Sequence, residues 1–232
     1  MTGGDWLAGW RFARRLNRLA NADGDARPLA DYAKGAWPAR GSPAREAPFL
    51  ALDFELDGLG TGAHVLQAGW LPFDASGIPL AGAEARDIRS GKTLDDAAVT
   101  VHGIGEERAR KGEPLVEVMP ELLRALSGRV VIAHGASIER DVLSRTTRKL
   151  YGMALPVRSI CTLAIERKIH PGLVGSEPYR LATARSRYNL PPHGQHDALG
   201  DALAAAELFL AQLSRLPADT SLGSLERLAV GH

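Results

Sequence analysis

The sequence predicts an α/β fold in which a mixed central sheet is flanked by helices. Three segments with strand character come early, at 49–56, 64–74 and 84–89, and turn-forming residues separate them, which favours a three-strand antiparallel meander. Later strand candidates at 129–133 and 157–160 alternate with helical patterns, as parallel strands joined by helices do. We therefore expect the meander to continue into parallel strands.

Each expected element follows from a local pattern. Residues 49–56 form a short apolar run that suits a strand buried on both faces. Apolar residues spaced three or four apart predict helices at 5–21, 115–126, 137–150, 162–168, 179–188 and 197–213, with a short helix around 30–34. Ser137 and Asp197 are the residue types that cap helix N-termini, and each stands at the expected start of a helix.

The length of 232 residues suits one α/β domain with an extension, or at most two small domains. Hydrophobic residues make up 45% and charged residues 24%, which is ordinary for a soluble globular protein with a core. We expect a helical or extended arm over 1–46, a compact domain over 47–217 and a tail over 218–232.

The net charge of +1 argues neither for nor against a nucleic-acid partner, so any basic surface must be local. The arm carries eight basic and five acidic residues, or 8 − 5 = +3. Two interpretations stay open. Its helix packs on the core with a solvated arginine face, or the arm binds nucleic acid or another partner.

The sequence also limits the cellular location of the protein and the kinds of site that it can form. No run approaches the roughly 18 apolar residues of a membrane span, and the first residues lack the pattern of a secretory signal. The single cysteine, Cys161, excludes an intramolecular disulfide and a cysteine-rich zinc site. We expect no membrane association and a cytoplasmic location.

Three clusters carry candidate chemistry. Asp53 and Glu55 lie at the end of the first buried strand, and alternation puts both on one face. Buried carboxylates are costly unless something pairs them, and a hard divalent cation is a usual solution. Each cluster alone has a plain structural explanation, which here is a strand end turning into solvent.

The second cluster follows the buried strand at 129–133. Glu139 falls in the first turn of the next helix, where acidic residues also occur for helix-dipole reasons alone. Asp141 is about 200° further around the helix and should point elsewhere.

The third cluster precedes and opens the last strong helix. His196 stands in the loop before the Asp197 cap, and Asp201 lies about one turn into the helix. A histidine beside a helix-borne carboxylate suits general-base chemistry next to a metal, although a surface histidine before a capped helix is common.

Together the clusters resemble the DnaQ-like (DEDDh) 3′-5′ exonucleases, a ribonuclease H-like family that includes DNA polymerase III epsilon subunits. The intervals between clusters, 139 − 53 = 86 and 201 − 139 = 62 residues, are also similar to the family's. The three matching motifs are Asp53-Phe-Glu55-Leu-Asp-Gly58-Leu59, Ala133-His134-Gly-Ala136-Ser-Ile-Glu139 and His196-Asp-Ala198-Leu-Gly-Asp201-Ala202. The resemblance covers roughly residues 48–213.

The resemblance implies hydrolysis from the 3′ end of a nucleic acid with two divalent cations, Mg²⁺ or Mn²⁺. It implies metal ligands at Asp53, Glu55, Glu139 and Asp201, with His196 taking a proton from the attacking water. Substrate contacts are implied at Leu56, Asp57, Gly58, Leu59 and His134. Leu56 and Leu59 are candidates for wedging against unpaired bases.

This sequence departs from the family at several positions. Glu139 replaces an aspartate, and its extra methylene changes the reach of the carboxylate. Leu56 and Asp57 replace two threonines, Gly135 replaces an asparagine, and Cys161 stands where an aspartate is frequent. These changes bear on substrate choice and on the second metal more than on the type of reaction.

Other functions remain as alternatives. The order His193-x-x-His196-Asp197 fits HD-type phosphohydrolases, but that fold is helical and the buried strands oppose it. A non-catalytic, polymerase-associated binding module on the same fold is a second alternative. A third is an RNA substrate, as in the oligoribonuclease and RNase T branches. A DNA polymerase is a candidate partner, and monomer and dimer both stay open.

Overall fold

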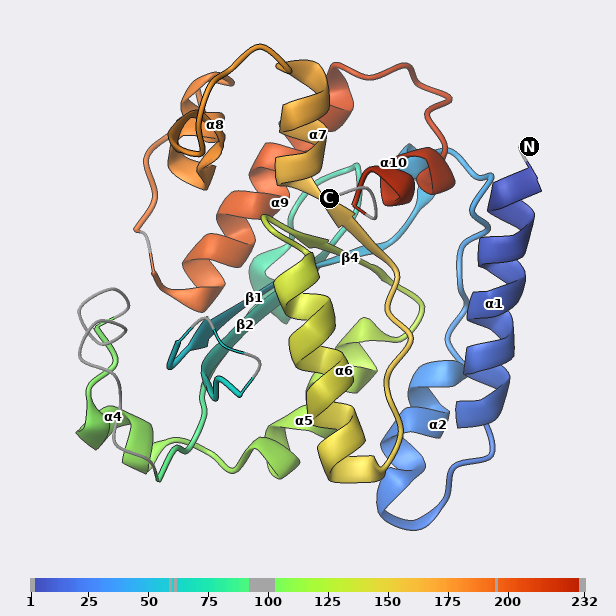
Figure 1. The fold of residues 1–232 in the computed structure, drawn as a ribbon, viewed down its shortest axis with the longest axis vertical. Coiled ribbons are helices and arrows are strands. Elements are labelled where there is room, and N and C mark those ends of the chain that lie inside the picture. The colour runs from blue at the N-terminus through green and yellow to red at the C-terminus, as the bar shows by residue number, and fades with distance from the viewer. Residues whose placement is uncertain (1–2, 59, 61, 92–102, 195, 230–232) are drawn as a thin grey trace.

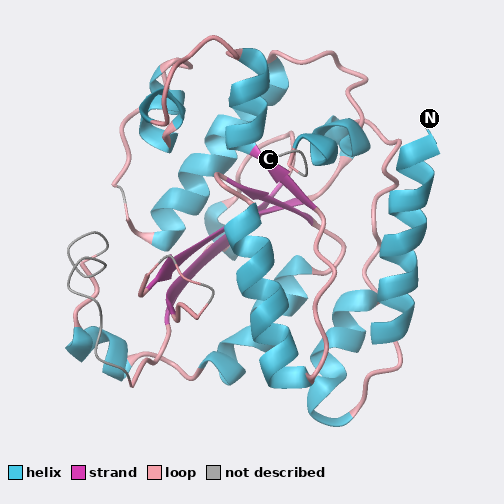
Figure 2. Cartoon of the chain, in the orientation of Figure 1, coloured by secondary structure: helices cyan, strands magenta, loops and turns pink. Residues whose placement is uncertain are grey.

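The computed structural model describes residues 3–58, 60, 62–91, 103–194 and 196–229. Within them, a five-stranded sheet has the order β3-β2-β1-β4-β5 (Figures 1 and 2). The strands are β1 (Phe49–Leu56), β2 (Val65–Phe73), β3 (Glu84–Asp87), β4 (Val130–Ala133) and β5 (Ser159–Cys161). β1, β2 and β3 pair antiparallel, whereas β4 is parallel to β1 and to β5. The expected mixed sheet is confirmed.

Helices flank this sheet on both faces (Figure 2). The α-helices are α1 (Gly3–Leu19), α2 (Arg27–Ala33), α4 (Glu106–Lys111), α5 (Leu115–Leu126), α6 (Ser137–Tyr151), α7 (Thr162–Ile169), α8 (Leu181–Ser186), α9 (Ala198–Ser214) and α10 (Leu222–Leu228). Short 3-10 turns are η1 (Gly24–Ala26), η2 (Ala44–Glu46), η3 (Leu80–Gly82) and η4 (Glu177–Tyr179). None of the described helices is long and apolar enough to cross a membrane.

Two details of the expected elements need correction. Ser137 does not cap α6, because it is already the first helical residue and Ala136 occupies the cap position. The segment expected as one helix over 179–188 divides into η4 and the short α8. By contrast Asp197 does cap α9, since its carboxylate accepts a hydrogen bond of 3.0 Å from the amide of Gly200.

β1 is buried on both faces because it is the central strand. Leu50 and Leu52 face the core layer that includes residues of α5 and α6. Phe49 and Ala51 face the opposite layer, where they meet Phe209 of α9. The central position of β1 places its carboxyl end, which carries the first acidic pair, between the two helical layers.

The arm and the tail are fastened to the domain and to each other. The Tyr32 hydroxyl donates 2.5 Å to the carbonyl of Pro156, and the rings of Phe12 and Trp37 meet at 5.0 Å. Pro43 forms a β-bridge with Ser221 ahead of α10. Segments outside the expected compact domain therefore complete its core.

The charged centre of this junction is the pair Arg158 and Glu226, which are 6% and 4% exposed. The Nε of Arg158 donates 2.7 Å to Glu226, and Arg40 of the arm pairs with the same carboxylate. A single buried acid thus joins the arm, the β5 region and the tail.

Candidate active site

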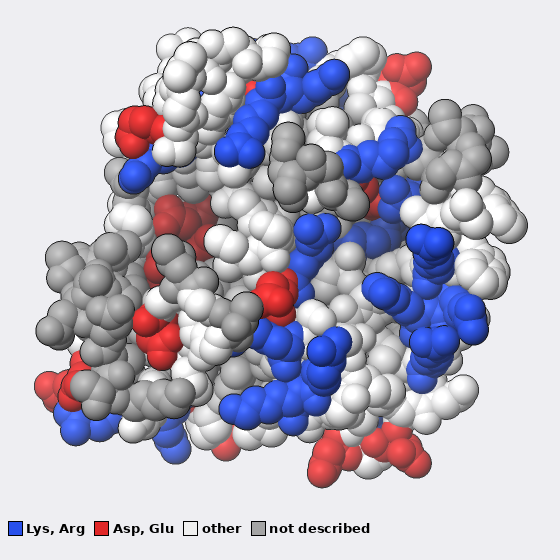
Figure 3. Space-filling model, in the orientation of Figure 1, with Lys and Arg blue, Asp and Glu red and all other residues white. Residues whose placement is uncertain are grey.

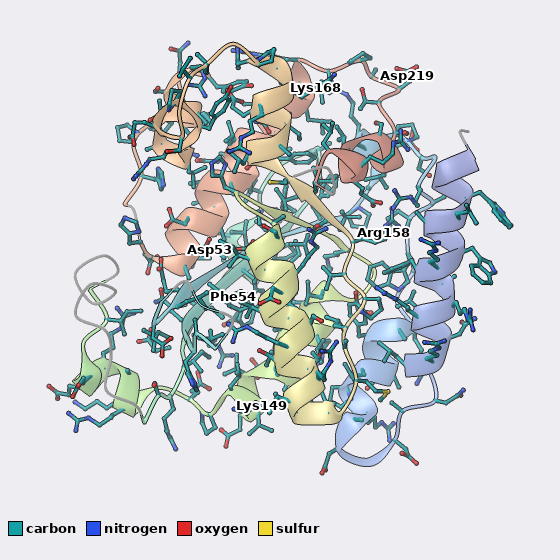
Figure 4. The ribbon with its side chains drawn as sticks, in the orientation of Figure 1. Asp53, Phe54, Lys149, Arg158, Lys168 and Asp219 are labelled. Atoms are coloured by element: carbon teal, nitrogen blue, oxygen red, sulfur yellow. The ribbon has the colours of Figure 1, made fainter. Side chains whose placement is uncertain are left out.

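The first acidic pair comes from β1. Asp53 is partly buried and Glu55 is 9% exposed, and both stand on the same face of the strand. Asp53 is paired with Gly69 of β2, and the register breaks between Glu55 and Leu56. Figure 4 shows Asp53 between α6 and α9, the two helices that carry the other clusters.

Glu139 reaches the site from α6. It lies in the first turn, immediately after a turn in which Gly135 has φ +109°, a conformation that favours glycine. The side chain is 3% exposed, and its Oε2 has no hydrogen-bond partner among the described residues. A buried carboxylate oxygen without a partner is costly, so this oxygen is available to a ligand such as a cation.

Asp201 reaches the site from the first turn of α9, where the preceding loop holds both of its oxygens. Its Oδ2 accepts a hydrogen bond of 2.9 Å from the amide of His196, which has φ +62°. Its Oδ1 lies 2.9 Å from Nε2 of His193. A carboxylate has about four lone-pair positions, so each oxygen can still accept a further partner.

The start of α9 sits unusually close to the sheet. A Cβ at Gly69 would lie 2.2 Å from the carbonyl carbon of Ala198, so only glycine fits there. The amide of Ala198 donates 2.9 Å to Oε1 of Gln67, and Gln67 in turn donates 3.1 Å to Asp87. Gly69 and Gln67 thus set the position of the helix that brings Asp201 towards Asp53.

The gathered carboxylates resist ionisation. Burial raises the pKa of Glu139 to about 8. Burial, followed by the charges of Asp201 and Asp197, raises the pKa of Glu55 to about 7. For Asp53, burial and then the charges of Glu139 and its other acidic neighbours raise the pKa well above the usual range. Mutual repulsion of this kind disappears when a cation binds between the groups.

These residues fit a divalent cation. Glu55, His196 and Asp201 each offer a ligand atom, and these atoms lie within 4.8 Å of one another. Asp53 interacts electrostatically with Glu139, Glu55 and Asp201, so carboxylates of all three clusters act on it. An oxygen-rich set of donors is the kind that Mg²⁺ and Mn²⁺ prefer.

The expected substrate contacts have different surroundings. Asp57 accepts a hydrogen bond of 2.6 Å from the amide of His64, which closes the loop after β1. Leu56 is half-buried against the core, and no atom of the described residues lies within 4 Å of a Cβ at Gly58. Leu59 lies outside the described residues.

His134 differs most from its expected role. Its Nδ1 lies 2.9 Å from the Thr162 hydroxyl and its Nε2 lies 2.8 Å from the Tyr179 carbonyl. Burial lowers its pKa to about 4. With both ring nitrogens engaged by the protein, His134 joins the β4 end to β5 and η4 and has no free nitrogen for a substrate.

Sequence reasoning missed three residues that shape the site. His193 was noticed only as part of an unrelated histidine pattern, although its spacing of eight residues from Asp201 allows the observed contact. Gln67 and Gly69 had no local signal, because their partners in α9 are about 130 residues away. Asp141 points away from the cluster and lies 3.4 Å from Arg145.

Residues 50–209 match the exonuclease family RNase_T. The chain belongs to this exonuclease family. It is 32% identical over 174 residues to the DNA polymerase III subunit epsilon of Aquifex aeolicus, a match that covers 62% of this chain and 85% of that protein. The expected DnaQ-like 3′-5′ exonuclease is therefore confirmed.

Solved structures share the fold of this exonuclease. Escherichia coli exonuclease I in complex with a dT13 oligonucleotide matches with a TM-score of 0.63 and 15% identity, over 74% of this chain and 41% of that one. The nuclease domain of 3′hExo, a DEDDh family member bound to rAMP, matches with a TM-score of 0.58 and 12% identity. That match covers 72% of this chain and 92% of the domain. This exonuclease thus spans less than half of exonuclease I.

Proposed function

We propose that this exonuclease removes nucleotides one at a time from the 3′ end of DNA by hydrolysing the terminal phosphodiester bond with the help of two divalent cations. The observation that carries the proposal is the convergence of four carboxylates at one end of the sheet. Asp53 and Glu55 come from β1, Glu139 from α6 and Asp201 from α9. The four carboxylates carry like charges that repel one another, and a cation bound between them would offset that repulsion.

The residues divide naturally into two ligand sets. Glu55 and Asp201 lie close together and would hold one cation with Asp53. Glu139 also interacts with Asp53 and would hold the second cation, with Asp53 shared between the two. When bound, the cations would supply Lewis-acid stabilisation of the charge that develops on the attacking and leaving oxygens.

His196 is the proposed general base. The His196 side chain is exposed, whereas Glu55 and Glu139 are buried. It can therefore contact a water molecule while it lies beside the carboxylates. Its backbone amide donates a hydrogen bond to Asp201, which holds the loop beside the carboxylates. A neutral imidazole there would take a proton from the attacking water.

We propose DNA rather than RNA as the substrate because of the proteins to which this chain is similar. The Aquifex relative is a DNA polymerase subunit, and the exonuclease I structure holds a DNA oligonucleotide. RNA is the second candidate, since the 3′hExo domain is bound to rAMP. Association with a DNA polymerase is proposed from the same relative.

The loop after β1 is the proposed seat of the terminal nucleotide. Leu56 ends β1 and Gly58 follows in the loop, where no described atom within 4 Å of a Cβ at Gly58 would oppose a sugar or base. Asp57 shapes the loop through its bond to His64. Leu59 stays a proposed base contact. His134 would act indirectly, by holding the turn that presents Glu139.

The test is gel-resolved digestion of 5′-labelled single-stranded DNA and RNA with Mg²⁺, Mn²⁺ or EDTA. We expect a metal-dependent ladder that shortens from the 3′ end and is lost in Asp53→Ala. Glu139→Gln should lose at least about 100-fold in rate, because a neutral amide holds a cation poorly. Asp141→Asn is the matched control on the same helix and should cleave like wild type. Absence of a ladder on both polymers with both metals would refute the nuclease activity.

A further inference from the structure

One face of α1 exposes large apolar side chains. Trp6 is 69% exposed, Leu7 46% and Trp10 50%. The opposite face of the helix, with Leu16 and Leu19, is buried in the core. Because α1 is already anchored by that buried face, its exposed tryptophans do not serve the packing of this chain, and such exposure marks an interaction site.

Arginines follow the tryptophans along the same helix. Residues four apart form a ridge, and here the ridge runs Trp6, Trp10, Arg14 and Arg18. The guanidinium carbon of Arg14 lies 5.5 Å from the centre of the Trp10 ring. We call these four residues, with Arg11 and Arg15 beside them, the Trp–Arg face. All six are exposed.

Other basic residues lie on the same side of the molecule as the Trp–Arg face. Figure 3 shows blue side chains gathered over α1 and over the lower part of α6 in one view. Arg148 and Lys149 are exposed near the end of α6, the helix that carries Glu139 at its other end. Two groups of basic side chains, one over α6 and one over α1, therefore lie on this side of the molecule.

We propose that the Trp–Arg face binds the single-stranded part of the substrate, several nucleotides upstream of the 3′ end held at the carboxylates. This inference rests on the proposed function, and it assigns the arm a role in holding the strand. Aromatic rings stack on unpaired bases of any sequence, and arginines neutralise the phosphates between them. An acidic protein partner would also bind to arginines, but the exposed Arg148 and Lys149 of α6, the helix that carries Glu139, favour the substrate itself.

The position of the face predicts a dependence on substrate length. A strand of about four nucleotides would fill only the site, whereas α1 lies across the molecule from Asp53 (Figure 4). Substitutions on α1 should therefore weaken the binding of long strands and leave the binding of short strands unchanged. The experiment compares 5′-fluorescent DNA of about 4 and about 25 nucleotides, with binding measured by anisotropy in EDTA and hydrolysis measured with Mn²⁺.

For Trp6→Ala/Trp10→Ala we expect at least about five-fold weaker binding of the long strand, from the loss of base stacking. KM for the long strand should rise by a similar factor, while the short strand is hydrolysed as by wild type. Equal binding of the long strand by the variant and the wild type would overturn the inference. No hydrolysis of either strand by wild type would refute the proposed function instead.

A second pair of variants tests the arginines. Arg11→Ala/Arg14→Ala should make the slope of log affinity against log salt shallower by about 1.4 for the long strand, or about 0.7 for each lost phosphate contact. The matched control is Arg110→Ala/Arg124→Ala, which removes two exposed arginines from α4 and α5. The same change of slope in both variants would mean general charge attraction only and would overturn the assignment to α1.

Discussion

Nε2 of His193 lies 2.9 Å from Oδ1 of Asp201, so a loop histidine that is not the proposed base holds a proposed metal ligand in place. Outer partners of metal ligands commonly fix the orientation of the ligand. The contact joins the loop before α9 to the first turn of α9, and it gives His193 a positioning role.

Replacing His193 with alanine should weaken Mn²⁺ binding and lower kcat by about 10- to 100-fold. The reason is that Asp201 loses one of the two hydrogen bonds that fix its orientation. His193→Asn can still donate a hydrogen bond and should recover part of the loss. Titration calorimetry with Mn²⁺ and steady-state kinetics provide the two measurements. Unchanged Mn²⁺ affinity in His193→Ala would show that the contact does not position Asp201.

Gly69→Ala should destabilise the chain by about 1–3 kcal/mol and reduce activity, because the new methyl would overlap the backbone of Ala198 and push α9 from the sheet. Urea unfolding gives the free energy, and the digestion assay gives the activity. Gly172→Ala is the control, since nothing lies within 4 Å of a Cβ there. If both variants behave alike, the close approach of α9 is unimportant.

The stability of the metal-free protein should fall as pH rises. Burial raises the pKa of Glu55 to about 7 and of Glu139 to about 8, above the values near 4 of an unfolded chain. The folded chain therefore binds these protons more tightly, so the stabilisation is complete below about pH 4 and is lost as pH rises through 7 and 8. Melting temperatures in EDTA between pH 5 and 9 measure this contribution.

Two further observations would check the cause of that fall. Glu139→Gln cannot ionise, so its melting temperature in EDTA should decline less between pH 7 and 9, whereas Asp141→Asn should follow wild type. Mn²⁺ should raise the melting temperature of wild type most at the alkaline end, where the carboxylates are charged. A melting temperature that declines equally in all three proteins would place the cause outside the site.

Glu226→Ala should cost about 3–5 kcal/mol in the free energy of unfolding, because it leaves Arg158 buried without its charge partner. The exposed pair Arg180 and Glu177 provides the control, and Glu177→Ala should change stability by less than about 1 kcal/mol. Urea unfolding measures both. A small loss in Glu226→Ala would indicate that the arm and tail are held by apolar packing alone.

The sequence predicted the elements whose signals are local. The apolar run of β1, the spacing of α5 and the Asp197 cap each depend on neighbours within a few residues, and each lies where it was expected. The arm was harder. Its helix was visible from periodicity, but the arm is tied to α10 by Arg40 and Glu226, which are 186 residues apart, and no local pattern encodes such a contact.

The site followed the same rule. The resemblance to the exonuclease family implied which carboxylates would meet. It did not indicate what holds them, because Gln67 and Gly69 act through contacts across the sheet. Similarly, the motif position of His134 suggested a substrate contact, whereas its hydrogen bonds to Thr162 and Tyr179 depend on packing that only the folded chain shows.

The carboxylates come from three segments whose outermost members, Asp53 and Asp201, are 148 residues apart, from 201 − 53. During synthesis, β1 and α6 leave the ribosome long before α9 does. A nascent chain therefore lacks Asp201 until α9 has been made and has docked beside Gly69. If the proposed site carries the activity, the order of the segments along the chain delays hydrolysis until this helix has docked.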